Sequence, residues 1–331
     1  MKEALITGGC GFVGRHFARR LLDDGWRVTV VDDLSTGIAP RNWAFQSNFS
    51  VNLSFELSDV RTWMKVSQAS EWDLVIHCAA IVGGRAKIEG DPLGVATDLA
   101  IDADFFNWVV KTKGLANPKV IYFSSSAVYP IVFQQKDNFC RLHEALVNLS
   151  EEGFTFDAPD MTYGWAKLTG ELLASYAQKQ GVDVAVYRPF SGYGEDQSLD
   201  YPFPALMQRI AYREDPLTIW GNGTQVRDFI HIDDIIDAVL DTYQVLPLGI
   251  PLNLGSGEGM SFLRLVQLAG NLVGPGYRAF ITVQPDKPTG VHYRVADIAR
   301  LTAYNFRPKI SLEEGILRSL QFFGLTFPTP T

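Results

Sequence analysis

The sequence predicts an α/β protein with a doubly wound parallel sheet and a smaller α/β lobe towards the C-terminus. Three features predict it: short, nearly continuous apolar runs, helical patterns between these runs, and a glycine-rich turn after the first run. Such apolar runs are typical of strands in a sheet that helices cover on both faces. Their alternation with helices indicates parallel connections between the strands.

The predicted strands and helices alternate through the first half of the chain. Strands are expected at 4–7, 27–32, 74–80, 119–126 and 182–189, and helices at 12–24, 95–113 and 161–180. The first helix places Phe12, Phe17 and Leu21 on one face, as in an amphipathic helix packed on a sheet. After about residue 190, short strands, glycine turns and helices are mixed. We therefore predict a main domain over 1–188, to which 229–256 return, and an interwoven smaller lobe over 189–331.

Composition and charge argue against a membrane protein, a secreted protein and a nucleic-acid-binding protein. The 331 residues are 47% hydrophobic and 20% charged, with a net charge of −8. The sequence has no apolar stretch long enough to span a bilayer, and MKEALITGG lacks the apolar core of a signal peptide. Cys10, Cys78 and Cys140 lack metal-ligand spacing, and no dense basic tract is present. We expect a cytoplasmic protein that binds neither membranes nor nucleic acid.

The stretch TGGCGFVG at 7–14 joins the first predicted strand to the first helix. Gly8 permits a tight turn, Gly11 lets the backbone approach a pyrophosphate, and Gly14 lets the helix pack closely on the sheet. The N–H groups and the positive dipole end of the helix then face the phosphates. Asp32 ends the next strand, where a carboxylate suits the ribose hydroxyls and repels a 2′-phosphate. These features predict a Rossmann-type fold that binds NAD rather than NADP.

TGGCGFVG and VVDDLSTG together resemble the extended short-chain dehydrogenase/reductase family, whose fingerprint is TGxxGxxG and whose members modify nucleotide-activated sugars. The resemblance continues in LSDVR, where the family contacts adenine, and in HCAA, which lies beside the cofactor. It implies cofactor contacts at Gly8, Gly11, Phe12, Val13, Gly14, Asp32, Asp33, Asp59, Val60, Ala79, Ala80, Tyr163, Lys167 and Pro189.

YGWAK places Tyr163 and Lys167 four residues apart on one face of a predicted helix. The Lys167 ammonium and a positive nicotinamide ring both favour the phenolate, so we expect a lowered pKa for Tyr163. Tyr163 can then remove a proton from a sugar hydroxyl while a hydride leaves the same carbon. The resemblance implies that Ser125, in SSSAVYP, shares a hydrogen bond with the reacting oxygen. The family's 4,6-dehydratases carry an acid beside this serine, where this chain has Ser126 and Ala127, so dehydration is disfavoured.

AAIVGGR, SSSAVYP and KPTGVHYRVAD resemble a narrower branch that includes GDP-fucose synthase and GDP-mannose 3,5-epimerase. With the wider family, this implies substrate contacts at Gly83, Gly84, Ser126, Ser191, Arg209, Arg227 and Lys287, the three basic residues gripping the phosphates. The chain departs from the branch at its catalytic cysteine, replaced by Ala127. It also departs at the second acid or base, where Asp200, Tyr201 and Pro202 stand.

HIDDI contains His231, Asp233 and Asp234, three potential metal ligands. Their spacing is more typical of a helix N-terminus with capping carboxylates than of a metal site. We therefore predict no metal.

We predict an NAD-dependent epimerase that transiently oxidises C4 of a nucleotide-diphosphate hexose and returns the hydride to the opposite face. One alternative is a GDP-hexose C3/C5 epimerase or 4-keto reductase that uses Asp200 or Tyr201. Another is a non-catalytic NAD-binding regulator. The sequence leaves the nucleotide and the sugar open. The resemblance implies a homodimer through the helices at 95–113 and 161–180.

Overall fold

The computed structural model describes residues 1–43, 51–81, 83–114, 117–149, 157–274 and 276–326. Within these residues the central sheet has the strand order β10-β6-β5-β4-β1-β2-β3, and every pair of neighbours is parallel. Its strands are β1 (Glu3–Thr7), β2 (Arg27–Asp32), β3 (Leu53–Leu57), β4 (Leu74–His77), β5 (Lys119–Phe123), β6 (Asp183–Pro189) and β10 (Leu252–Leu254). This order is that of a Rossmann-type sheet with one added edge strand.

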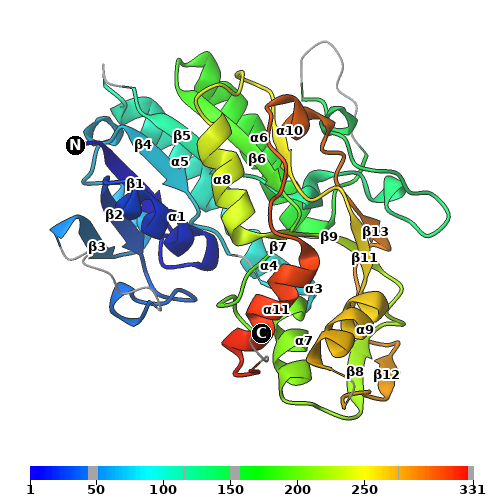
Figure 1. Cartoon of the computed structure of the whole chain (residues 1–331). Helices are drawn as coiled ribbons and strands as arrows, with labels where there is room; N and C mark the ends of the chain where they lie inside the picture. Colours follow the sequence, from blue (N-terminus) through cyan, green and yellow to red (C-terminus); the bar gives the residue numbers. More distant parts are fainter. Residues whose placement is uncertain (44–50, 82, 115–116, 150–156, 275, 327–331) are drawn as a thin grey trace.

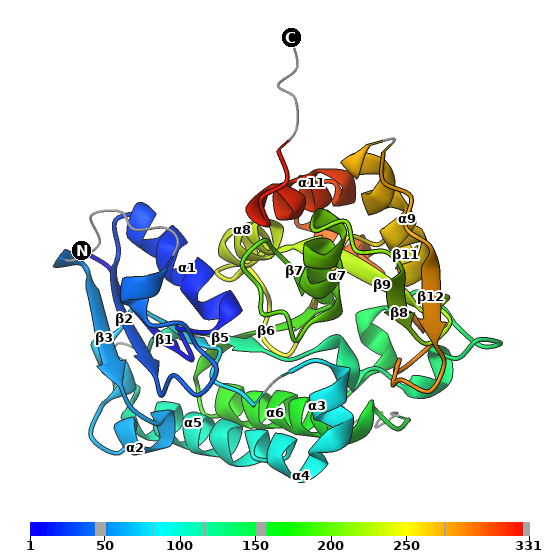
Figure 2. The same cartoon turned by 90° about the horizontal axis from the view of Figure 1, so that it is seen from below.

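Helices cover both faces of the central sheet, which explains its continuous apolar runs (Figure 2). One face carries α2 (Val60–Trp63), α5 (Asp98–Thr112) and α6 (Met161–Lys179). The other carries α1 (Phe12–Asp23), α8 (Ile232–Thr242) and α10 (Ala299–Ala303). The doubly wound parallel sheet predicted from the sequence is confirmed.

The smaller lobe is built from residues that follow β6 (Figure 1). Its strands are β7 (Ser191–Tyr193), β8 (Leu217–Trp220), β9 (Val226–His231), β11 (Gly259–Ser261), β12 (Ile281–Gln284) and β13 (Tyr293–Arg294). β9 pairs with β7 and β13 in parallel and with β11 antiparallel, while β8 pairs with β12. The helices α7 (Pro202–Ala211), α9 (Phe262–Val273) and α11 (Leu312–Phe322) pack around a separate apolar core.

The chain crosses between the two lobes more than once. After β9 it returns through α8, and β10 extends the central sheet beside β6. Two short helices, α3 (Arg85–Gly90) and α4 (Pro92–Val95), lie between β4 and α5. The exact division of the chain at residues 188 and 189 stays a prediction.

Several element boundaries differ from the sequence-based prediction. β4 ends at His77 and β5 ends at Phe123, so their final predicted residues lie in loops. The polar serines at 124–126 leave the ladder, and Ser125 caps a short 3-10 helix over Ser126–Val128. The edge strand β3 was not predicted because it is largely exposed and lacks a continuous apolar run.

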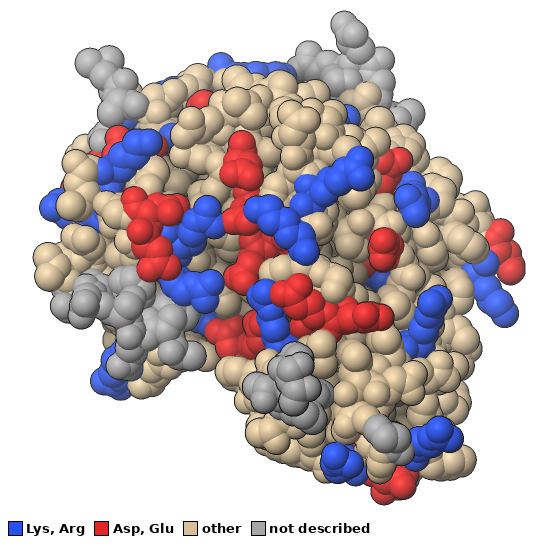
Figure 3. All heavy atoms as spheres, viewed as in Figure 1, with Lys and Arg blue, Asp and Glu red and all other residues tan. Residues whose placement is uncertain are grey.

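Positive and negative side chains alternate over the face that carries α1, α8 and α11 (Figure 3). Asp237 pairs there with Arg20 and Lys309, and Asp233 pairs with Arg318. Such an interspersed pattern differs from the continuous basic surface of a nucleic-acid-binding protein. Within the described ranges, the helices are too short or too polar to cross a bilayer.

Candidate active site

The glycine loop between β1 and α1 is packed so tightly that side chains would not fit. Gly8 has a φ of +66°, and a Cβ there would stand 2.5 Å from the backbone nitrogen of Ala79. A Cβ on Gly14 would stand 2.6 Å from the Gly8 carbonyl oxygen. Helix α1 begins with Gly11 as its N-cap and has no side-chain cap. Because the first N–H groups of a helix have no partner within it, this terminus suits a pyrophosphate.

Asp32, at the end of β2, is fixed beside this loop. Its Oδ2 accepts a hydrogen bond of 2.9 Å from the Cys10 N–H, and its Oδ1 one of 2.8 Å from the Leu34 N–H. Burial raises the pKa of Asp32, and these backbone donors oppose the shift. A carboxylate keeps further lone pairs for two ribose hydroxyls. Together with the glycine cradle, Asp32 therefore fits NAD.

The other predicted cofactor residues lie near the same edge of the sheet. Asp59 follows β3 and caps α2, where it accepts from the Arg61 N–H at 2.8 Å. Ala79 and Ala80 follow β4, and Pro189 ends β6. Because the carboxyl ends of parallel strands share one edge, these residues surround the expected cofactor position. Their individual contacts, with those of Phe12, Val13, Asp33 and Val60, stay predictions.

The structure brings the three predicted catalytic residues together. Tyr163 and Lys167 lie one turn apart on α6, and the Ser125 side chain lies close enough to the Tyr163 hydroxyl to lower its pKa. Ser125 also accepts a hydrogen bond of 3.1 Å from the Ala127 N–H, which fixes its position at the end of β5. Lys167 is 4% exposed. This arrangement can hold a substrate hydroxyl between a serine and a tyrosine that has a cation behind it.

The expected lowering of the Tyr163 pKa is not found for the protein alone. Burial raises the pKa of Tyr163, and Lys167 lowers it, as the sequence suggested. Asp98 and Asp102 on α5 act against Lys167 and raise the pKa again. The effect of Lys167 is as predicted, but two carboxylates behind the lysine, which no sequence motif indicated, oppose it. The ammonium alone therefore does not make this phenol acidic. The contribution of the nicotinamide ring stays a prediction.

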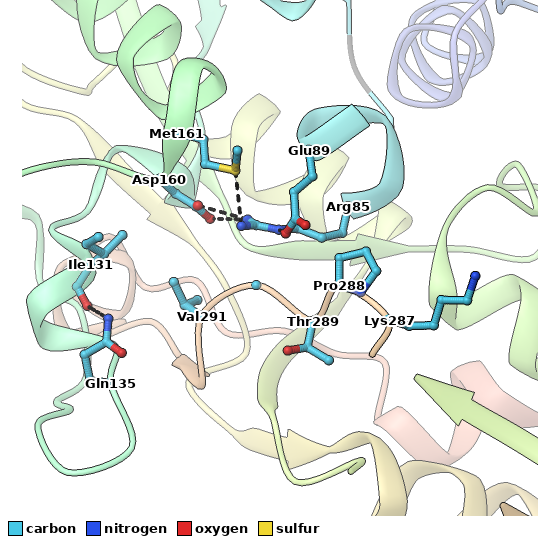
Figure 4. A pocket seen from close by; sticks show the side chains of 11 residues that line it. Arg85, Glu89, Ile131, Gln135, Asp160, Met161, Lys287, Pro288, Thr289 and Val291 are labelled. Atoms are coloured by element: carbon cyan, nitrogen blue, oxygen red, sulfur yellow. Dashed lines mark hydrogen bonds and ion pairs between the residues drawn. The ribbon is translucent and has the colours of Figure 1, made fainter. Parts of the chain in front are cut away.

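A pocket of about 430 Å³ opens near the start of α6 (Figure 4). It is lined by Arg85, Glu89, Ile131, Gln135, Asp160, Met161, Lys287, Pro288, Thr289, Gly290 and Val291. Figure 4 shows Arg85 reaching across to Asp160 and Met161, with Lys287 and Thr289 on the facing loop. Asp160 is the N-cap residue of the helix that carries Tyr163, so the pocket adjoins the catalytic residues.

Three guanidinium groups gather beside Asp160 here; we call Arg85, Arg227, Arg294 and Asp160 the arginine cluster. At its edge Arg85 also pairs with Glu89. Nη1 of Arg85 donates to both oxygens of Asp160 at 2.9 Å, and Nη2 of Arg294 donates to its Oδ2 at 2.8 Å. Arg227 donates to the carbonyl oxygens of Val226 and Thr289 at 2.8 and 2.7 Å.

Arg227 carries the unbalanced charge of this cluster. Among the described residues, no carboxylate forms an ion pair with it. Burial, and then the neighbouring Arg294, lower the pKa of Arg227 to about 9. A cation enclosed in this way calls for an anion that the protein itself does not provide. Guanidinium forks match phosphate oxygens in geometry, so the cluster can bind a diphosphate.

The three predicted phosphate-binding residues differ in their positions. Lys287 lines the pocket, and Arg227 belongs to the arginine cluster. Arg209 instead donates to both oxygens of Glu214, at 2.8 and 2.6 Å, and to the Thr218 carbonyl at 2.7 Å. Because these contacts occupy its guanidinium at the end of α7, a phosphate contact by Arg209 stays an untested prediction.

The smaller predicted residues lie close to the site. Gly84 is the N-cap of α3, and a Cβ there would stand 2.3 Å from the Asp200 carbonyl oxygen. Gly83 precedes it, Ser126 is buried in the turn after Ser125, and Ser191 begins β7. Their contacts with a substrate stay predictions.

Sequence reasoning missed Arg85, Asp160 and Arg294. Arg85 directly follows the glycine pair, Asp160 stands three residues before Tyr163, and Arg294 lies within KPTGVHYRVAD. These three residues come from separate elements and meet only in the folded chain. In the sequence, the one sign of their role is that each lies in or beside a recognised motif.

The HIDDI motif forms a helix start, as predicted, with a different cap. The His231 ring accepts from the Asp233 N–H at 3.2 Å, so the cap is the imidazole and not a carboxylate. Asp234 instead accepts from the N–H groups of Lys309 and Ile310. The described part of the chain contains no cluster of three or more potential metal ligands.

Comparison with known proteins identifies the family. The model of the NAD dependent epimerase/dehydratase family matches residues 4–255, and the chain belongs to this family. Its cofactor is NAD, in agreement with the glycine loop and Asp32.

Similar proteins share the length of the chain. A UDP-glucuronate 4-epimerase from Thermodesulfobacterium geofontis is 29% identical over 96% of this chain and 95% of its own. A UDP-N-acetyl-alpha-D-glucosaminuronate decarboxylase from Bacillus cytotoxicus is 26% identical over 97% and 98%. The solved structure of a UDP-glucose 4-epimerase from Thermotoga maritima has a TM-score of 0.80 at 23% identity, covering 97% of this chain and 98% of its own. The last similarity supports the fold, and the first two leave the specific reaction open.

Proposed function

We propose that this protein is an NAD-dependent epimerase that inverts C4 of a nucleotide-diphosphate hexose. The observation that carries the proposal is the close approach of Ser125 to the Tyr163 hydroxyl, with Lys167 one turn further along α6. Helix α6, which carries Tyr163, starts directly after Asp160 of the arginine cluster. The site thus combines an oxidising cofactor, a proton acceptor and an anion-binding subsite.

Each residue has a role that follows from its position. The arginine cluster and Lys287 would hold the diphosphate, so that the sugar extends towards Tyr163. Tyr163 would take the proton of the 4-hydroxyl and later return it, while Ser125 hydrogen-bonds the same oxygen. NAD, when bound, accepts the hydride from C4 and gives it back. Inversion requires that the sugar turns in the pocket between the two transfers.

The chain also lacks groups that other reactions of the family need. Ser126 and Ala127 stand where a dehydratase carries its acid, which disfavours dehydration. The curated relatives include both a 4-epimerase and a decarboxylase of UDP-uronates. Both reactions are consistent with a first oxidation at C4, so a uronate substrate has to be included in the test.

The proposal is tested by incubating the purified protein with a panel of nucleotide sugars in D₂O and following the products by NMR. The panel contains UDP-glucose, UDP-N-acetylglucosamine, UDP-glucuronate and GDP-mannose. We expect inversion at C4 without deuterium on the ring. Loss of the C6 carboxylate from UDP-glucuronate would instead show a decarboxylase. Tight NAD binding without turnover of any sugar would favour a non-catalytic regulator.

One observation favours a second candidate, a C3/C5 epimerase or 4-keto reductase. Tyr201, the N-cap residue of α7, lies close enough to Tyr163 for the two phenols to influence each other. Burial, and then the charge of an ionised Tyr163, raise the pKa of Tyr201. Asp200 is exposed and accepts from the Ser198 hydroxyl at 3.1 Å, so it is a weaker candidate for this role. Solvent deuterium at C3 or C5 in the same experiment would support this candidate.

We further propose that the protein is a homodimer through α5 and α6. Leu99 on α5, with Trp165 and Tyr176 on α6, is an exposed large apolar side chain, at 39%, 44% and 54% respectively. Apolar side chains exposed on two adjacent helices are typical of a protein–protein contact. Light scattering on the wild type and on a Trp165→Glu, Tyr176→Glu double variant tests this, with loss of the dimer expected only in the variant.

A further inference from the structure

Lys167 is enclosed by two carboxylates from α5, and we call Lys167, Asp98 and Asp102 the lysine cluster. Oδ2 of Asp98 lies 3.9 Å from Nζ of Lys167, and the Asp98 side chain is fully buried. The other oxygen of Asp98 accepts from the Ile81 N–H. Oδ2 itself has no hydrogen-bond partner among the described residues. Buried polar atoms normally have a hydrogen-bond partner, so an unpartnered carboxylate oxygen beside the Lys167 ammonium indicates a role other than stabilising the fold.

Asp102 is anchored differently, by a chain of polar contacts that reaches the glycine loop. Its Oδ1 lies 3.2 Å from Nε2 of His77, and its Oδ2 accepts from the Tyr122 hydroxyl. Nδ1 of His77 lies 2.7 Å from Oγ1 of Thr7, the residue before Gly8. The second carboxylate of the lysine cluster is thus linked to the loop that binds the cofactor.

The charges around the cluster do not balance. Lys167 carries one positive charge, and the two carboxylates together carry two negative charges. Burial lowers the pKa of His77, so its imidazole adds no positive charge at neutral pH. Other groups that act on the cluster are Tyr122 from β5, Cys78 directly after β4, and Lys87 from α3. Tyr201, the N-cap residue of α7, and Arg294 from β13 interact with Tyr163.

We propose that Asp98 and Asp102 are positioning residues that hold the Lys167 ammonium and offset its charge, so that Tyr163 stays a neutral phenol until a positively charged cofactor ring binds beside it. The proposal rests on the proposed function only for the task assigned to Tyr163. In this arrangement Tyr163 becomes a base only when the oxidised cofactor is bound. It also favours a neutral phenol, able to return its proton, when the ring is reduced and uncharged.

The electrostatic directions within the cluster agree with this geometry. Both carboxylates raise the pKa of Lys167 despite its burial, so it stays an ammonium. Burial raises the pKa of Asp98 to about 6, with Lys167 opposing the shift. Asp98 and Asp102 each raise the pKa of Tyr163. Removing either negative charge is therefore expected to make Tyr163 more acidic.

The test is an ultraviolet titration of Tyr163 in the full-length protein with NAD⁺ bound. The phenolate signal is isolated by subtracting the same titration of the Tyr163→Phe variant. We expect Asp98→Asn to lower the midpoint by about one pH unit. Asp104→Asn is the matched control, because Asp104 is exposed on the same helix, and it should leave the midpoint unchanged. In the wild type, NADH in place of NAD⁺ should raise the midpoint.

Asp102→Asn serves as the second variant and should shift the midpoint in the same direction. It also guards against a folding defect of Asp98→Asn, which circular dichroism would detect. An unchanged or raised midpoint in a folded variant overturns the proposal, as does a wild-type midpoint that ignores the oxidation state of the cofactor. The titration needs no sugar. A shifted midpoint without sugar inversion would refute only the proposed function, and inversion with unshifted midpoints only the inference.

Discussion

The lysine cluster and the arginine cluster are both enclosed groups of charges, and their imbalances have opposite signs. Among the described residues, the lysine cluster joins one ammonium to two carboxylates. The arginine cluster has three guanidinium groups beside two carboxylates, Asp160 and the Glu89 that pairs with Arg85. The first lies behind Tyr163 on the sheet side, and the second lines the pocket at the start of the same helix.

The opposite imbalances indicate which charge each ligand must carry. An excess of enclosed charge costs free energy in the free protein, and a ligand of opposite charge relieves that cost. The lysine cluster then matches a positive ring, and the arginine cluster matches a diphosphate. Helix α6 connects the two, because Asp160 caps it and Tyr163 and Lys167 lie on its first turns.

The largest expected effect is at Tyr163, which both clusters influence. Tyr163→Phe removes the proton acceptor and leaves the ring, so we expect kcat to fall by about 10²- to 10⁴-fold. Binding of NAD and of the nucleotide sugar should change little, as measured by calorimetry. Tyr176→Phe, an exposed position on the same helix, is the control. Full activity of Tyr163→Phe would show that Tyr163 is not the proton acceptor, so that the two clusters would not act on a common catalytic group.

A large effect on affinity is expected at Arg227. Arg227→Met removes the charge without a carboxylate partner, so binding of the nucleotide sugar should weaken by about 10- to 100-fold. The unfolding temperature of the ligand-free variant should not fall, because repulsion among three guanidinium groups is relieved. Calorimetry and thermal unfolding measure the two effects.

Arg209→Met is the matched control for this variant. Because Glu214 already holds the Arg209 guanidinium, we expect unchanged affinity for the nucleotide sugar. If Arg209→Met weakened binding of the nucleotide sugar and Arg227→Met did not, the phosphate subsite would have to lie at the end of α7. The arginine cluster would then not be the anion-binding group.

A smaller effect is expected at the cofactor ribose. Asp32→Asn keeps an acceptor for the Cys10 N–H but loses the negative charge, so NAD should bind about tenfold more weakly and NADP relatively better. Asp23→Asn is the control, since Asp23 is exposed at the C-terminal end of α1 and is not among the predicted cofactor contacts. The ratio of the two affinities, from fluorescence titration, checks this. Equal ratios for the two variants would contradict the role of Asp32.

The same comparison explains what the sequence could predict. The cofactor end depends on residues that are close in the chain, such as Gly8, Gly11 and Gly14, and on the strand that follows them. Backbone geometry there leaves only glycine, so the sequence pattern records the structure directly. The fold, the NAD site and the pairing of Tyr163 with Lys167 were predictable for this reason.

The clusters could not be predicted because their members come from distant elements. Asp98, Asp102 and Lys167 lie on two different helices, and neither carboxylate belongs to a motif. Arg85, Asp160 and Arg294 likewise come from three separate elements, although each lies in or beside a recognised motif. For this reason the motif indicated that Lys167 lowers the pKa of Tyr163, but not that Asp98 and Asp102 oppose this effect.

The last expected effect is on stability, at Asp98, and it does not depend on a ligand. With a pKa of about 6, the native carboxyl binds more protons than the unfolded chain between about pH 4 and 6. Wild-type stability therefore falls as pH rises through this range, and Asp98→Asn lacks this loss. The free energy of unfolding of the variant relative to the wild type should rise by on the order of 2 kcal/mol between about pH 4.5 and 7. Urea unfolding at several pH values measures it, with Asp104→Asn as the flat control. If the difference in the free energy of unfolding between Asp98→Asn and the wild type did not change with pH, Lys167 would already balance the charge of Asp98. The lysine cluster would then have no excess negative charge for the cofactor ring to offset.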